Sequence, residues 1–127
     1  MRRTLDSLRD RMDSLGVLLS GLCAVHCVAS VLLVGVLGLG GQLLLAPEIH
    51  EFGLALAVVI GAVTLGIGAL RHGRLEPMLL GACGLALMAS ALFVDHGIGE
   101  AALTICGVAL VAAAHLRNVR SGLHHRA

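Results

Sequence analysis

The chain has 127 residues, which is room for one domain, and its net charge of +1 gives no sign of nucleic-acid binding. Apolar residues make up 57% of it and charged residues only 13%, whereas a soluble domain carries about 25% charged residues. The chain has 17 Gly and no Trp or Tyr, a composition more typical of close-packed membrane helices than of a soluble core.

The first residues form an amphipathic segment in which Leu5, Leu8, Met12 and Leu15 recur at spacings of three and four. The pattern predicts a short amphipathic N-terminal helix lying on the inner membrane surface, with its Arg residues near anionic lipid headgroups. The alternative is a helix that merely extends the first membrane span inward.

Four apolar stretches are long enough to cross a bilayer, for which a helix needs about 17–25 residues. They run over about 15–39, 52–70, 77–94 and 98–116. The last is the weakest, because Gly99 and Glu100 fall in its first turn. Residues 58–70 contain no charge and therefore no polar face, which disfavours a soluble bundle. The sequence predicts an all-α, integral membrane four-helix bundle, formed by a single domain over residues 1–127.

The basic residues lie on one side of this predicted bundle. All nine are Arg, and they occur in the N-terminal segment, in the loop between the second and third spans, and in the tail. The other two loops carry Glu48, Glu51 and Asp95 but no base. Because cytoplasmic loops carry the excess of Arg, we expect both termini in the cytoplasm.

The first span contains the residues that suggest chemistry, Ser20-Gly-Leu-Cys23-Ala-Val-His26-Cys27. Cys23 and Cys27 are one helical turn apart and share a face, and His26 borders that face. We expect them near the middle of the bilayer, where an ionisable residue is a functional hypothesis by default. Other His residues are expected at the water boundary, His50 and His96 in the outer loops and His72 and His115 at the inner ends. His26 is then the only strongly ionisable residue deep in a span.

Two thiolates and a dication form a neutral unit, which avoids most of the cost of burying charge. Soft ligands select soft ions, and mercuric ion also prefers linear two-coordinate geometry. Zinc would need four ligands, and Cu(I) would leave one negative charge. His26 is predicted to accept a proton released by ligation; the alternatives are a third ligand or a polar packing residue.

Cys83 and Cys106 each lie alone on a span and are expected to pack as small hydrophobic residues. No catalytic set and no resident cofactor is suggested, so we do not expect an enzyme. The leading function is a membrane carrier for a soft metal ion. The alternatives are a membrane thiol-disulfide oxidoreductase and a non-catalytic scaffold subunit. Four short helices enclose little space, so a homodimer is plausible.

The segment from Asp13 to Cys27, the four spans and the closing Ala114-His115-Leu116-Arg117-Asn118 resemble the MerC domain family. The resemblance covers nearly the whole chain. It implies a multi-pass protein of the bacterial inner membrane that takes up mercuric ion into the cytoplasm, with Cys23 and Cys27 as ligands. The ion would pass on to cytosolic thiols or a mercuric reductase. The transposon-borne transporters of the family have C-x-x-C and a second Cys pair near the C-terminus, whereas this chain has C-x-x-x-C and no Cys in its tail.

Overall fold

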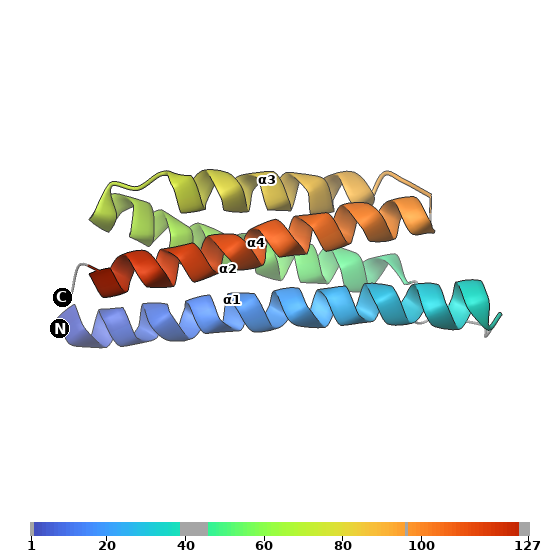
Figure 1. Cartoon of the computed structure of the whole chain (residues 1–127), viewed down its shortest axis with the longest axis horizontal. Coiled ribbons are helices and arrows are strands. Elements are labelled where there is room, and N and C mark those ends of the chain that lie inside the picture. Colours follow the sequence, from blue (N-terminus) through green and yellow to red (C-terminus); the bar gives the residue numbers. More distant parts are fainter. Residues whose placement is uncertain (1, 39–45, 96, 125–127) are drawn as a thin grey trace.

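The computed structural model describes residues 2–38, 46–95 and 97–124. The last residue of the first predicted span, Leu39, and His96 lie outside these ranges. Four helices run side by side in one elongated bundle (Figure 1). They are α1 (Arg2–Ser30), which continues as a short π-helix η1 (Val31–Val36), then α2 (Pro47–His72), α3 (Glu76–Ala91) and α4 (Ile98–His124).

The helix boundaries follow from local signals in the sequence. Pro47 begins α2, where its missing N–H costs no hydrogen bond. Gly73 ends the same helix in the left-handed conformation with φ +65°, and its N–H donates to the carbonyl of Ala69. The antiparallel order places the start of α1 and the end of α4 at one end of the bundle, hereafter the terminal end (Figure 1). α2 and α4 begin at the opposite end.

The distribution of side chains is that of a membrane protein. Large apolar residues face outward, as with Phe52, Leu70 and Phe93, whose exposed fractions are 71%, 89% and 90%. Polar side chains, in contrast, lie inside: Asp13, Ser20, Ser30, Thr64, Glu100, Thr104, His115, Asn118 and Ser121. Among the residues in the structure, three helical segments are long and apolar enough to cross a membrane: Asp10–Ser30, Pro47–Arg71 and Ile98–Ser121. The chain is therefore an all-helical membrane bundle.

The third helix differs from its prediction. α3 has 16 residues and ends at Ala91, so it is only about 24 Å long, against a hydrocarbon core of about 30 Å. α3 is the shortest of the four helices, whereas the sequence pattern had indicated the fourth apolar stretch as the poorest candidate for a membrane span. α3 packs closely on α4 because Gly84 and Gly107 face each other; a Cβ on Gly84 would lie 2.6 Å from the Gly107 carbonyl oxygen. A small core of Met88, Val108 and Val111 completes this contact.

The N-terminal segment does not form a separate surface helix. α1 runs without a break from Arg2 to Ser30, so the alternative of an inward extension of the first span is the one found. The prediction of a separate helix was wrong, because no break divides the segment from the span: Leu8 and Leu15 of the apolar stripe lie on the exposed surface of the same helix that buries Asp13.

Candidate functional site

Cys23 and Cys27 share a face of α1, as their spacing predicts, and this face borders a cavity. Cys27 is buried and Cys23 is half-buried. The cavity has a volume of about 240 Å³ and is partly open. α1 contributes both thiols and His26 to its lining, and the first turns of α2 contribute His50 and Phe52. Met88 and Thr104 lie behind the thiols on α3 and α4.

His50 is the second imidazole of the cavity. Its Nε2 lies 3.9 Å from the Cys27 sulfur and 3.7 Å from a carboxylate oxygen of Glu100. The rings of His26 and His50 meet edge to face, with their centroids 5.5 Å apart. Nε2 of His26 is buried and has no hydrogen-bond partner. The cavity thus gathers two thiols and two imidazoles from α1 and α2, and the carboxylate of Glu100 on α4 lies next to one of the imidazoles.

The depth of this site differs from the prediction. The cysteines lie level with His50 and Glu100, which stand within the first turn of α2 and α4, and not near the middle of the span. The physical reason is that α2 begins at Pro47, before the predicted 52, so its first turn places His50 beside Cys27. The sequence assigned His50 to a solvated loop and so missed it as a neighbour of Cys27.

The described residues contain no group of three or more His, Cys, Asp or Glu side chains arranged to hold a metal ion. His26 therefore stands beside the thiol pair on the cavity wall without forming a three-ligand centre with it. A two-coordinate ion needs only the two thiols, so the arrangement suits the linear geometry better than a tetrahedral one. Cys83 and Cys106 are exposed on the outer surface of the bundle, away from the cavity.

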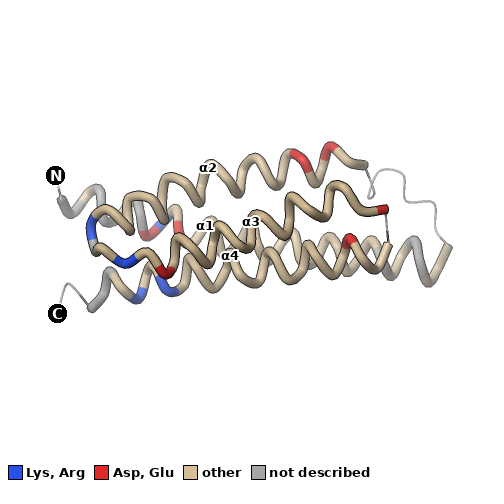
Figure 2. Tube along the Cα trace, turned by 90° about the horizontal axis from the view of Figure 1, so that it is seen from above, with Lys and Arg blue, Asp and Glu red and all other residues tan. Residues whose placement is uncertain are grey.

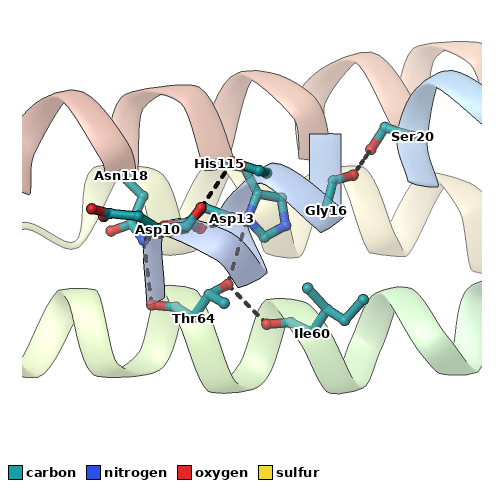
Figure 3. Close-up of polar contacts among 9 residues, drawn as sticks. Asp10, Asp13, Gly16, Ser20, Ile60, Thr64, His115 and Asn118 are labelled. Carbon is teal, nitrogen blue, oxygen red and sulfur yellow. Dashed lines mark hydrogen bonds and ion pairs between the residues drawn. The ribbon is translucent and has the colours of Figure 1, made fainter. Parts of the chain in front are cut away.

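A second polar cluster lies closer to the terminal end (Figure 3). We call it the Asp13 cluster; its members are Asp13, Thr64, His115 and Asn118. Nδ1 of His115 lies 2.7 Å from Oδ1 of Asp13, and the side chains are 1% and 0% exposed. The amide of Asn118 donates to Oδ2 of Asp13 at 2.9 Å and to the carbonyl of Thr64 at 3.3 Å. The cluster joins α1, α2 and α4.

Two glycines leave the space that the side chains of the Asp13 cluster occupy. A Cβ on Gly16 would lie 2.5 Å from Nε2 of His115, and one on Gly68 would lie 2.1 Å from Oδ1 of Asn118. The sequence did not indicate that Asp13 and His115 are buried inside the bundle. Their segments carried only the resemblance to a family. Their separation of 102 positions along the chain hid the pairing.

The terminal end also carries the Arg residues of the structure (Figure 2). Arg117 of α4 and Arg74, in the connection between α2 and α3, both pair with Glu76. Arg74 also donates to the hydroxyl of Ser121 at 3.3 Å. The opposite end has acidic but no basic side chains in the part of the chain that is drawn in colour (Figure 2). The Arg residues that the sequence predicts on one side of the bundle therefore do lie together at one end of the structure.

Comparison with known proteins gives one match. The family model described as MerC mercury resistance protein matches residues 13–120, a segment that contains both cysteines of the cavity and the whole Asp13 cluster. No curated protein and no solved structure matches the chain.

Proposed function

The chain belongs to the MerC mercury resistance protein family, and from this we propose that it is a membrane carrier for a soft metal ion, mercuric ion first. The observation that supports the proposal is the cavity at the opposite end, where Cys23 and Cys27 stand one turn apart on α1. The ion enters this cavity and binds both sulfurs. Each S–H bond breaks as an S–metal bond forms, so two protons leave and the loaded site is neutral.

His50 lines the cavity, and beside it Glu100 supplies a carboxylate that attracts a cation. The Glu100 carboxylate is only 10% exposed and faces His50, which in turn faces Cys27. Partial burial strengthens its attraction for a positive ion relative to a solvated loop carboxylate. After binding, the ion is transferred by thiol exchange to cytosolic thiols or a mercuric reductase on the other side. An oxidoreductase would instead cycle the two cysteines through a disulfide.

Anaerobic titration of the purified protein tests the binding step. We expect one mercuric ion per chain to bind tightly, with Cd²⁺, Zn²⁺ and Cu(I) weaker, because only mercuric ion combines softness, double charge and two-coordination. The matched control is the Cys23→Ser/Cys27→Ser variant, in which tight binding should disappear. Zn²⁺ binding as tightly as mercuric ion would contradict the two-coordinate site.

His26 is proposed to accept one of the released protons rather than to bind the ion. His26→Leu should keep most of the equilibrium affinity for mercuric ion and slow its loading by roughly tenfold or more, as for loss of a general base. Stopped-flow loading and equilibrium competition on the same variant separate these effects, with Cys83→Ser as the control. A large loss of affinity would make His26 a third ligand, and an unchanged loading rate would end the proton-acceptor role.

We further propose that the protein spans the bacterial inner membrane with its terminal end in the cytoplasm. The support is the segregation of Arg residues to that end (Figure 2). Reporter fusions after Gly73 and at Ala127 should report a cytoplasmic location, and fusions near Glu48 and Gly97 an outside one. An outside signal at Gly73 would reverse the orientation and, with it, the direction of uptake.

A further inference from the structure

Among the described residues, the bundle is closely packed between the thiols and the terminal end. On that side of the cysteines lies a second void of only about 10 Å³, lined by Cys23 at one side and His115 at the other, about the smallest volume that holds a single water. Gly16 and Ser20 line the same void from α1. Beyond it the Asp13 cluster fills the space between α1, α2 and α4 (Figure 3). An ion on Cys23 and Cys27 therefore lies in the larger cavity, with the Asp13 cluster as a plug between it and the terminal end.

The plug is tight because its side chains press on glycine backbone. The His115 ring lies where a Cβ of Gly16 would stand, and the Asn118 amide lies where a Cβ of Gly68 would stand. Neither contact leaves room for an ion to pass. Hydrogen bonds from His115 and Asn118 then hold both oxygens of the Asp13 carboxylate. Passage requires α1 to move away from α4.

Such a movement separates Asp13 from His115 and Asn118. Breaking hydrogen bonds to a buried carboxylate is costly, so these contacts favour the closed arrangement. We propose that the Asp13 cluster is the gate at the terminal end of the transport path, held closed by the hydrogen bonds of the Asp13 carboxylate. The inference rests on the proposed carrier function, since only an ion that leaves by the terminal end needs this gate.

Three helices contribute side chains to the gate. On α1, Asp10 lies within one turn of Asp13 (Figure 3). α2 contributes Thr64, whose hydroxyl donates to the carbonyl of Ile60 and lies 3.5 Å from Nδ1 of His115. α4 contributes His115 and Asn118, which both contact the Asp13 carboxylate.

Sided labelling of the thiols tests the gate. The experiment uses the Cys83→Ser/Cys106→Ser background in sealed spheroplasts and inverted vesicles, with a membrane-impermeant methanethiosulfonate and no metal. In the parent, we expect fast labelling of Cys23 and Cys27 from the face at the opposite end. Labelling from the terminal face should be slow. Asp13→Asn, which removes the charged acceptor of the cluster, should raise terminal-face labelling about tenfold or more, the loss expected for a charged hydrogen bond.

Two further variants test whether a change in labelling comes from the contact between Asp13 and His115. His115→Asn retains a donor for Asp13 and should raise terminal-face labelling less than Asp13→Asn does. Thr64→Val removes a neighbouring hydroxyl but keeps the pair, and should leave labelling near the parent value. Unchanged labelling from the terminal face in both Asp13→Asn and His115→Asn, with labelling from the other face intact, would overturn the gate. Because no metal is used, failure of the cysteines to bind mercuric ion would contradict the proposed function alone.

Discussion

His115→Leu is expected to lower the free energy of unfolding by about 1.5–3 kcal/mol, the usual contribution of a hydrogen bond to a charged group. The change leaves the carboxylate of Asp13, which is 0% exposed, without the imidazole 2.7 Å away. The amide of Asn118 remains as a donor but carries no charge. Reversible unfolding in mixed micelles, followed by circular dichroism, measures the effect.

The control is the double variant Asp13→Leu/His115→Leu. It removes both partners of the buried hydrogen bond together, so it should be less destabilised than His115→Leu alone. A single variant that loses under about 1 kcal/mol, the range of an ordinary surface pair, would show that the contact contributes little to stability. Other contacts between α1 and α4 would then have to hold the gate closed.

The sequence was sufficient for the helical architecture and for the thiol pair. Helix periodicity places Cys23 and Cys27 on one face from the sequence alone, and Pro47 and Gly73 mark the ends of α2. Both signals are local, so they do not depend on how the helices pack. The same is true of the Arg distribution, which needs only the order of the loops.

Contacts between helices could not be predicted in this way. The pairing of His50 with Cys27, and of Asp13 with His115, depends on the depth and rotation of one helix against another. In a Gly- and Ala-rich membrane bundle many rotations bury similar apolar area, so hydropathy does not select one. One usable signal was present: Asp13 and His115 fall within the two segments that resemble the family, and charged residues in spans usually face a partner.

The second large effect concerns the thiols themselves. Cys23→Ser and Cys27→Ser are each expected to abolish most binding of mercuric ion, because a hydroxyl is a hard, weak ligand and one thiolate leaves the ion half coordinated. Cys83→Ser and Cys106→Ser should bind as the parent does, since both residues are exposed and do not line the cavity. Equilibrium competition with a thiol chelator measures all four. Equal losses in all four variants, or none in any, would remove the cavity as the binding site.

Initial uptake of mercuric ion into proteoliposomes is the measurement that tests the carrier most directly. The ion is offered outside as a charged thiol complex, since neutral mercuric salts cross lipid unaided, and a thiol is trapped inside as acceptor. The parent protein should fill the vesicles at a rate proportional to its amount, while Cys23→Ser/Cys27→Ser should match vesicles without protein. Uptake by the double variant at the parent rate would contradict transport through the cysteine pair.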